Sequence, residues 1–392
     1  MADSGLRQVR DVPASTRGGD CSWLRAWIAE TWPRALPARQ ADCLEGRVGM
    51  RIGVLTGGGD CPGLNAAIRA VVRRAESFGW EVLGYKNGWA GLLGEGDAEQ
   101  MTGKSVSGIL PTGGTILGTS RTNPLKKEEH VQQVLHNLQK HELGGLVAIG
   151  GDDTLSVAAR LFERGAKTVG VPKTMDNDVD CTDFTIGFNS AVSIVADALD
   201  KLHTTAFSHH RVLVVEVMGR DAGWVAVVGG LAGGADYILI PEVPTKLSDV
   251  CDHLRQRRAR GKDFSIIVVS EGAEVLGVEA AETGGTVDAF GHARLDRRAI
   301  GEVLARAIEK ETGFETRVTV LGHLQRGGSP TVFDRVLATR LGVAAVDYVR
   351  DGRFGYMPAL AGTQIVPVKL SDAVARNRTV DLELLEVAKV FY

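Results

Sequence analysis

Residues 50–78 have the sequence MRIGVLTGGGDCPGLNAAIRAVVRRAESF. The apolar run at 51–55 predicts a buried strand, and the segment 64–78 predicts a helix. The glycine-rich turn between them lets backbone N–H groups approach an anion, and the amino terminus of the following helix adds partial positive charge. Such a turn taken alone is more often only a turn, and its spacing is not that of a dinucleotide-binding motif. The stretch therefore predicts a strand–turn–helix unit with a candidate phosphate loop.

The same alternation of strand and helix continues along the chain. Further strands are predicted at 146–149, 168–171, 211–217 and 264–269, and a helix at 155–164. Almost continuously apolar strands are typical of parallel sheets that are covered by helices on both faces. The predicted fold class is therefore α/β with a mostly parallel sheet. Ligands of such sheets bind beyond the carboxyl ends of the strands, so the loops at these ends are the candidate sites.

The composition limits the classes of function. Among 392 residues, 45 Lys and Arg face 48 Asp and Glu, and the net charge of −3 argues against a nucleic-acid or membrane partner. Five dispersed cysteines without a C-x-x-C pair indicate a reducing, cytoplasmic location. No apolar run approaches the roughly 20 residues that cross a bilayer. The length predicts two domains, and residues 1–49 are predicted to be a poorly ordered extension.

A second glycine loop follows the strand at 146–149 and has the sequence GGDDT at residues 150–154. Two glycines admit a phosphate, and a carboxylate beside them suits Mg²⁺, which bridges carboxylate and phosphate oxygens. The alternative is that Asp152, Asp153 or Thr154 only caps the next helix. Capping accounts for one acid but does not readily account for two adjacent acids behind two glycines.

The third loop has the sequence PKTMDND at residues 172–178. Phosphoryl transfer needs in-line positioning, charge neutralisation and a group that accepts the hydroxyl proton. Asp176 is a candidate for that base, and Asp178 is a candidate to orient the base or a cation. For this loop alone, an Asp/Asn-rich turn without a catalytic role is the simpler interpretation.

Six motifs together carry a resemblance that none of them carries alone. They are GGDCPG at 58–63, GGD at 150–152, PKTMDND at 172–178, MGR at 218–220, SEG at 270–272 and GHLQRGGSP at 322–330. In these motifs and their order, the chain from residue 50 to about 353 resembles the phosphofructokinases. The resemblance implies two similar Rossmann-like three-layer domains with the active site in the cleft between them. Their expected bounds are 50–187 with about 325–375 for the phosphoryl-donor domain, and 188–324 with the C-terminal tail for the fructose 6-phosphate domain.

The resemblance also implies roles for single residues. Asp176 would be the general base for the 1-hydroxyl of fructose 6-phosphate, Thr174 would hold the sugar and the transferred group, and Asp178 would support the base. The residues expected to act on the donor and on the cofactor Mg²⁺ are Asp152, which would reach the metal, Gly58, whose backbone would contact the donor phosphate, and Arg121, which would neutralise the transferring group.

The implied sugar-phosphate site draws on two subunits. In the family, two arginines from the neighbouring subunit reach the 6-phosphate, and they correspond to Arg211 and Arg317. The guanidinium fork matches phosphate oxygens, so several arginines on one phosphate are physically sensible. A homo-oligomer follows, and the sequence leaves dimer and tetramer both open. The expected residues of the same subunit are Thr174, Asp176, Met218, Gly219, Arg220, Glu271, His323 and Arg326, with Arg220 also acting in catalysis.

Two positions bear on the phosphoryl donor. Members of the family that use ATP generally have Gly where this chain has Asp153 and Lys173. The carboxylate of Asp153 would fill the place of the α-phosphate of ATP and repel it, and Lys173 would supply a cation to pyrophosphate. The alternative is a surface salt bridge between the two residues without a role in donor choice. The expected reaction is a reversible, Mg²⁺-dependent phosphoryl transfer from pyrophosphate to the 1-hydroxyl of fructose 6-phosphate.

Two other functions remain open at this point. One is an ATP-dependent 6-phosphofructokinase with an unusual donor loop, which an assay with each donor in turn separates from the first. The other is a non-catalytic, sugar-phosphate-binding subunit. The sequence disfavours that subunit, because Asp152, Asp176 and Asp178 are all present.

Overall fold

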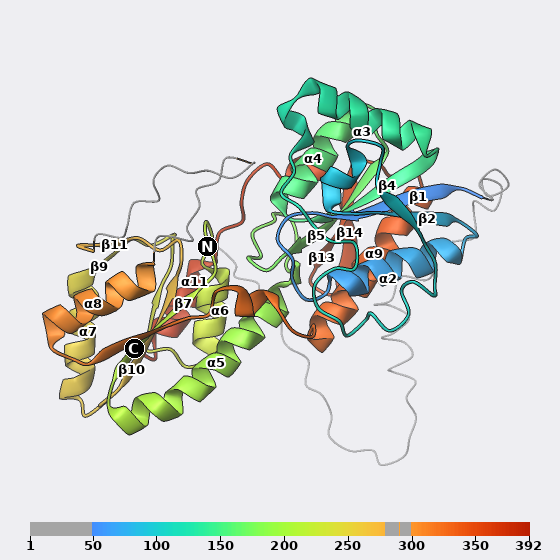
Figure 1. Cartoon of the computed structure of the whole chain (residues 1–392). Helices are drawn as coiled ribbons and strands as arrows, with labels where there is room; N and C mark the ends of the chain where they lie inside the picture. Colours follow the sequence, from blue (N-terminus) through green and yellow to red (C-terminus); the bar gives the residue numbers. More distant parts are fainter. Residues whose placement is uncertain (1–48, 279–289, 291–298) are drawn as a thin grey trace, which may run out of the picture. The chain divides into compact units, whose positions relative to one another are not determined.

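The computed structural model describes residues 49–278, residue 290 and residues 299–392 (Figure 1). The predicted extension at 1–49 lies outside the described residues, apart from Gly49. The described residues from Gly49 to Tyr392 belong to one compact unit that contains both of the larger sheets.

The first sheet is mostly parallel. Its strands are β1 (Arg51–Thr56), β2 (Glu81–Tyr85), β3 (Ala98–Met101), β4 (Leu143–Gly150), β5 (Thr168–Thr174), β6 (Ile186–Gly187), β13 (Tyr356–Ala361) and β14 (Gln364–Lys369). The order is β14-β13-β5-β4-β1-β2-β3, with β6 beside β5. The edge strand β3 pairs antiparallel with β2, and the edge strand β14 pairs antiparallel with β13. The other described pairs of this sheet are parallel.

Helices cover both faces of this sheet, which explains why its central strands are continuously apolar. In β4, Val147 and Ile149 pack in the cluster that includes α2 (Leu64–Glu76) and α9 (Val332–Arg350). The alternate residues Leu146 and Ala148 pack in a second cluster with α3 (Glu128–Lys140), α4 (Asp152–Glu163) and α10 (Leu370–Ala373). Successive side chains of a strand point to opposite faces, so a strand between two helix layers buries both sets.

The second sheet repeats this three-layer arrangement. It has the order β12 (Thr316–Val320), β7 (Val212–Val217), β10 (Ser265–Ser270) and β8 (Tyr237–Leu239), and all three described pairings are parallel. The helices α5 (Phe188–His209) and α6 (Trp224–Ala232) pack on one face, and α7 (Leu247–Ala259) and α8 (Ile300–Thr312) on the other. A parallel pair, β9 (Thr245–Lys246) and β11 (Val275–Leu276), stands apart. The predicted α/β class with mostly parallel sheets is confirmed.

Helix α5 connects the two sheets. Helix α5 leads from β6 of the first sheet to β7 of the second (Figure 1). Its first turn is held from α9, because the buried carboxylate of Asp334 accepts hydrogen bonds from the backbone N–H groups of Gly187 and Ser190 at 3.0 and 2.7 Å. The other short elements are η2 (Gly88–Leu92), η3 (Pro124–Lys126), η4 (Gly322–Arg326) and α11 (Leu382–Lys389).

The structure refines the predicted bounds at the two loops that matter most. The helix predicted at 155–164 is α4, which already begins at Asp152, and the strand predicted at 168–171 is β5, which continues to Thr174. Lys173 is therefore a strand residue. The proposed division into two domains stays a prediction. None of the described helices is both long and apolar enough to span a bilayer.

Candidate active site

A cleft of about 630 Å³ lies beyond the carboxyl ends of the strands of both sheets. It receives residues that follow β1, β4 and β5 of the first sheet and β7, β10 and β12 of the second. This is the position that the parallel topology predicts for a ligand. The predicted site residues that line it are Gly58, Arg121, Asp152, Asp153, Lys173, Thr174, Asp176, Asp178, Met218, Arg220, Glu271, His323 and Arg326.

The glycine loop, residues 57–63, makes a tight passage from β1 to α2. Gly58 and Gly63 have φ values of 77° and 114°, which favour glycine. A Cβ atom on Gly59 would lie 2.3 Å from Nη1 of Arg326, so a larger residue here would have to displace that guanidinium. The backbone N–H of Gly58 donates to the carbonyl of Ser120 at 3.3 Å, and Thr119 Oγ1 donates to the carbonyl of Gly58 at 2.6 Å. The segment that carries Arg121 thus lies against the loop expected to hold the donor.

The second glycine loop does not match the capping interpretation. The N-cap residue of α4 is Gly151, and no side-chain capping hydrogen bond is found at this end of the described helix. Asp152 and Asp153 lie in the first helical turn and line the cleft. The interpretation of Asp152, Asp153 or Thr154 as the N-cap is therefore wrong.

Lys173 is buried, with 2% of its surface exposed. Its ammonium group donates hydrogen bonds to the backbone carbonyls of Gly57 at 3.1 Å and Gly59 at 2.5 Å. Burial lowers the pKa of this ammonium, because the charged form loses its hydration. Since the side chain lies under the glycine loop, the interpretation of Lys173 as part of a surface salt bridge is also wrong.

Two carboxylates, of which Asp178 is buried and Asp176 partly buried, lie in the acidic loop, which we define as residues 174–183. Oδ1 of Asp176 and Oδ1 of Asp178 are buried and have no hydrogen-bond partner among the described residues. Burial, followed by the charges of Asp176 and Asp152, raises the pKa of Asp178 to about 8. Burial also raises the pKa of Asp176, which Arg326 and Arg220 lower in part. Two carboxylates that each bury an oxygen without a hydrogen-bond partner destabilise the fold unless a cation or a proton joins them.

The acidic loop is held by an asparagine to which the sequence analysis assigned no role. Asn177 is buried and has a φ of 54°. Its side-chain oxygen accepts from the N–H of Thr185 at 2.9 Å, and its amide donates to the carbonyl of Asp183 at 3.3 Å. This closed turn points the flanking Asp176 and Asp178 to the same cleft. Asn is among the residues that tolerate this backbone region, so the D-N-D pattern carried a usable signal.

The second sheet contributes the other wall of the cleft. Arg326 donates from Nη1 to the carbonyl of Asp60 at 3.0 Å, so it contacts the glycine loop of the first sheet. Glu271 follows β10, and burial together with the charge of Asp176 raises its pKa to about 7. Arg220 donates from Nε to Asp221 at 2.8 Å. Both Arg326 and Arg220 lower the pKa of Asp176, which places positive charge near the candidate base.

Three predicted sugar-site residues are not among the residues that line the cleft in the described chain. Gly219 instead shapes the wall, because its carbonyl accepts from Ser270 Oγ at 2.6 Å and from the N–H of Gly272 at 3.0 Å. Arg211 and Arg317 lie at the amino ends of β7 and β12, away from the carboxyl ends that form the cleft. Both pair with Glu315, at 2.7 and 2.6 Å. Their predicted role on a neighbouring subunit stays a prediction.

A family model described as Phosphofructokinase matches residues 51–349. The chain belongs to the phosphofructokinase family. A relative from Amycolatopsis mediterranei, named pyrophosphate--fructose 6-phosphate 1-phosphotransferase, is 55% identical over 345 residues, which are 88% of this chain and 100% of the relative. A relative from Corynebacterium efficiens, named ATP-dependent 6-phosphofructokinase, is 47% identical over 344 residues, 88% of this chain and 99% of the relative. The resemblance drawn from the six motifs is confirmed.

A solved structure of the family has the same fold. The phosphofructokinase of Pichia pastoris in the T-state is 32% identical, with a TM-score of 0.74. The match covers 88% of this chain and 36% of the Pichia chain, so the present chain spans about a third of that one.

Two polar residues at the cleft were not predicted from the sequence: Glu216, which lines it, and Gln325, which is bonded to its wall at Met218. Gln325 is fully buried in η4, and its Oε1 accepts from the N–H of Met218 at 3.3 Å, which ties two predicted motifs together. Glu216 lines the cleft and accepts from the N–H of Gly301 at 2.7 Å, at the start of α8. Gln325 lies inside the quoted GHLQRGGSP motif, whereas Glu216, in an apolar strand, gave no signal beyond being polar there.

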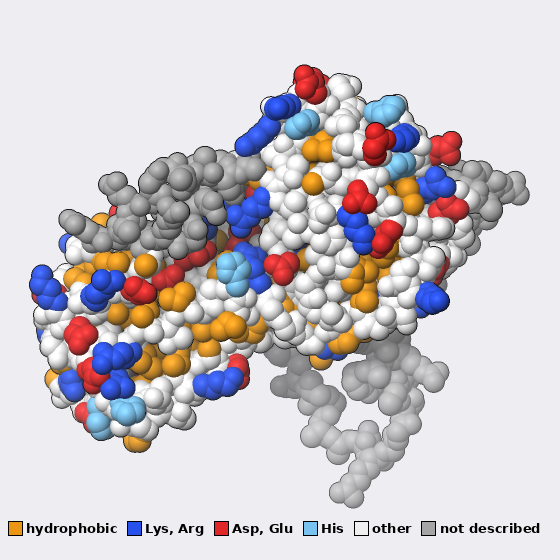
Figure 2. Space-filling model, in the orientation of Figure 1, with side chains coloured by type: hydrophobic (Ala, Val, Ile, Leu, Met, Phe, Trp, Pro, Cys, Tyr) orange, Lys and Arg blue, Asp and Glu red, His pale blue; other side chains and the backbone are white. Residues whose placement is uncertain are grey.

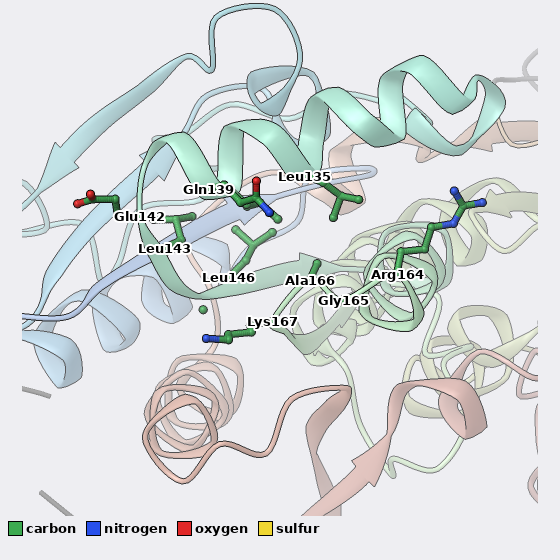
Figure 3. A pocket seen from close by; sticks show the side chains of 11 residues that line it. Leu135, Gln139, Glu142, Leu143, Leu146, Arg164, Gly165, Ala166 and Lys167 are labelled. Carbon is green, nitrogen blue, oxygen red and sulfur yellow. The ribbon is translucent and has the colours of Figure 1, made fainter. Parts of the chain in front are cut away.

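A smaller pocket of about 290 Å³ lies at the opposite edge of the first sheet. It is formed by α3, the amino end of β4 and the segment before β5 (Figure 3). Leu135 and Leu146 form part of its apolar wall, and Lys167 lies at its side (Figure 3). Glu142 is the acidic residue among its described lining residues, and neither glycine loop nor the acidic loop reaches it. Charges of both signs are scattered over the face seen in Figure 2, in line with the small net charge.

Proposed function

We propose that this protein is a pyrophosphate-dependent 6-phosphofructokinase. The observation that carries the proposal is the presence of Asp153 and Lys173 in one cleft, beside Gly58. The relatives at 51–55% identity that are named for the pyrophosphate reaction support it. Relatives named for the ATP reaction are 46–47% identical. The difference in overall identity is small, so identity alone is weak evidence for which donor this protein uses.

The cleft gives a physical reason for the choice of donor. Asp153 lies in the first turn of α4, where a helix terminus would otherwise attract a phosphate. A carboxylate at this place repels a third phosphate group and occupies its volume. Lys173 lies under the glycine loop with its hydrogen bonds directed to that loop, so its charge remains close to a donor held by Gly58. Pyrophosphate, with two linked phosphates, then fits where a nucleoside triphosphate does not.

In the proposed reaction, Asp176 accepts the proton of the 1-hydroxyl while O1 of the sugar attacks the nearer phosphorus of pyrophosphate. The new O1–P bond forms as the bridging O–P bond breaks, and inorganic phosphate leaves. Arg121, Arg220 and Lys173 would neutralise charge on the transferring group. Because pyrophosphate replaces ATP, the proposed reaction runs readily in both directions.

The residues of the cleft fit a bound Mg²⁺ that is shared with the donor. No cluster of three or more His, Cys, Asp or Glu side chains forms a metal cage in the described part of the chain. The cleft does contain two carboxylates with unpartnered oxygens, and the charge of Asp152 acts on both. We propose that Asp152 holds the ion, which would supply charge neutralisation on the phosphate oxygens. The positive charge of the ion would also keep Asp176 ionised as a base.

The same proposal includes a homo-oligomer and a cytoplasmic location. Arg211 and Arg317 present guanidinium groups outside the cleft of their own chain, as residues that serve a neighbouring subunit must. The described cysteines, Cys61, Cys181 and Cys251, are free thiols, as is usual in a reducing compartment.

A paired-donor assay tests the proposal. The purified protein is incubated with fructose 6-phosphate, Mg²⁺ and either pyrophosphate or ATP, and kcat/KM is measured for each donor. We expect pyrophosphate to be preferred by about 100-fold or more, the scale of one misplaced charge in a partly enclosed site. Equal or faster turnover with ATP would reject the proposal in favour of the ATP-dependent enzyme. The Asp176→Ala variant, purified in parallel, excludes a contaminating activity.

A further inference from the structure

The segment between α10 and α11 crosses from the acidic loop to the second sheet, and we call residues 376–380 of it the strap. The backbone N–H of Arg378 donates to the carbonyl of Asp178 at 2.8 Å. Next to it, Val179 and Asn377 form an antiparallel β-bridge. The strap is therefore paired, through one isolated bridge and one further backbone hydrogen bond, with the part of the acidic loop that carries Asp178.

The side chain of Arg378 adds contacts in both directions. Its Nη1 donates to the carbonyl of Asp183 at 2.8 Å, at the far end of the acidic loop. Its guanidinium carbon lies 4.3 Å from the ring centroid of Trp224, the first residue of α6. The indole Nε1 of Trp224 donates in return to the carbonyl of Arg378 at 3.1 Å. A guanidinium stacked on a largely buried indole is held by cation–π attraction as well as by packing.

The strap also reaches the loop expected to bind the sugar, residues 218–223. Oε1 of Glu242 accepts from the N–H of Val380 and from the N–H of Gly223, both at 2.9 Å. Trp224 continues this loop, is 7% exposed and packs edge-on against Phe188. One end of the strap is thus bonded to the acidic loop and the other to the base of the sugar loop.

We propose that Arg378 is a positioning residue that holds the acidic loop in register with the sugar-binding loop. Asp178 Oδ1 has no hydrogen-bond partner among the described residues, so the placement of this side chain depends on the backbone of the acidic loop. The backbone N–H of Arg378 bonds to that loop at Asp178, and the Arg378 side chain, which binds Asp183 and Trp224, holds the strap in the position that allows this bond. Arg378 is not among the residues that line the cleft, so it acts through Asp178 and Asp176 rather than on substrate. The inference rests on the proposed function for the identity of the reaction.

The Arg378→Ala variant tests this role by separating kcat from KM. A displacement of about 1 Å at reacting groups costs about 100-fold in rate, so we expect kcat to fall about 10- to 100-fold. The KM values for pyrophosphate and fructose 6-phosphate should change by no more than about threefold, because Arg378 touches neither substrate. Arg378→Lys keeps a cation over the indole and a donor for Asp183, so it should recover most of kcat.

Arg376→Ala is the matched control on the same strap. The side chain of Arg376 is 80% exposed and pairs with Asp180 of the acidic loop at 2.5 Å. An exposed ion pair contributes little to the stability of the segments that it joins, so kcat of Arg376→Ala should stay within about twofold of wild type. An unchanged kcat in Arg378→Ala overturns the proposal. So does an equal loss in Arg376→Ala, or a failure of Arg378→Lys to exceed Arg378→Ala.

A double-variant cycle with Trp224→Leu addresses the coupling itself. If Arg378 and Trp224 act as one contact, the double variant should lose no more kcat than the worse single variant. Losses that multiply would overturn the coupling. The ratios of variant to wild type are measured with whichever donor the wild type uses. Failure of wild-type turnover with pyrophosphate therefore rejects the proposed donor, while the variant ratios decide the role of Arg378.

Discussion

Replacing Lys173 by methionine removes one positive charge from beneath the glycine loop while almost conserving side-chain volume. The ammonium now lies 3.1 Å from the carbonyl of Gly57 and 2.5 Å from that of Gly59. A Cβ atom built on Gly58 would lie 3.7 Å from it, so a group held at Gly58 is close to the charge. The variant is therefore expected to affect the donor directly and the fold only slightly.

The expected loss follows from the geometry. A phosphate oxygen about 5 Å from the ammonium gains about 3 kcal/mol at an effective dielectric constant of about 20. If this interaction acts in the transition state, its loss lowers kcat/KM by about two orders of magnitude. Stability should change by less than about 2 kcal/mol, because two carbonyls lose a donor but a buried charge, whose pKa is lowered by burial, also disappears.

The assay compares kcat/KM for pyrophosphate in the wild type, Lys173→Met and Lys167→Met, together with the melting temperature of each. Lys167 is exposed beside the smaller pocket of Figure 3 and is the matched control. A fall of about 100-fold in Lys173→Met alone supports the argument. If that variant melts normally and stays within about threefold of wild type, the charge of Lys173 does not act on the donor.

Three further predictions concern the carboxylates and the subunit boundary. Asp176→Ala should lower kcat by about 100- to 10,000-fold with little change in the dissociation constant of fructose 6-phosphate, measured by calorimetry, because it removes the base but no phosphate contact. Burial raises the pKa of Asp178 to about 8 in the folded state, whereas its pKa in an unfolded chain is about 4. Between these two pH values the folded state binds more protons than the unfolded state. The free energy of unfolding therefore falls as the pH rises from 4 to 8. Asp178→Asn should therefore be more stable than wild type at pH 8, with the difference shrinking toward pH 4, in urea titrations; an equal difference at both pH values contradicts this assignment. Arg317→Ala should raise the KM for fructose 6-phosphate about tenfold or more. When Arg317→Ala and inactive Asp176→Ala subunits are mixed, some sites should regain a normal KM, because they combine Asp176 of one subunit with Arg317 of the other. Mixtures that show no such sites would place Arg317 outside the neighbouring active site.

The sequence was most informative where local pattern and burial agree. The apolar runs of β1, β4, β5, β7 and β10 predicted these strands within a few residues, since strands buried on both faces leave an almost unbroken apolar signature. The strands β12, β13 and β14 were not predicted. In β12 the buried and exposed residues mix, and β13 contains Pro358, so neither shows a clear periodic signal.

The site was predictable as a set of residue types but not as a set of contacts. Glycines and acids after strands indicated phosphate chemistry, and the parallel topology then required those loops to meet. Whether Asp152 capped α4 or faced the cleft depended on the N-cap, which the structure assigns to Gly151. The placement of Arg211 and Arg317 outside their own cleft could be expected only from the family resemblance.

The amino-acid sequence by itself determined the α/β class, the glycine loops and the acids that follow the strands, because these depend on neighbours within a few positions. Only the tertiary structure decided that Lys173 is buried beneath Gly57 and Gly59, that Arg326 reaches Asp60, and that Arg378 joins the acidic loop to Trp224. The hydrogen bonds among these contacts join residues that are 114 to 266 positions apart in the sequence. Their geometry follows from how the helices and sheets pack, and no local pattern of residues encodes it.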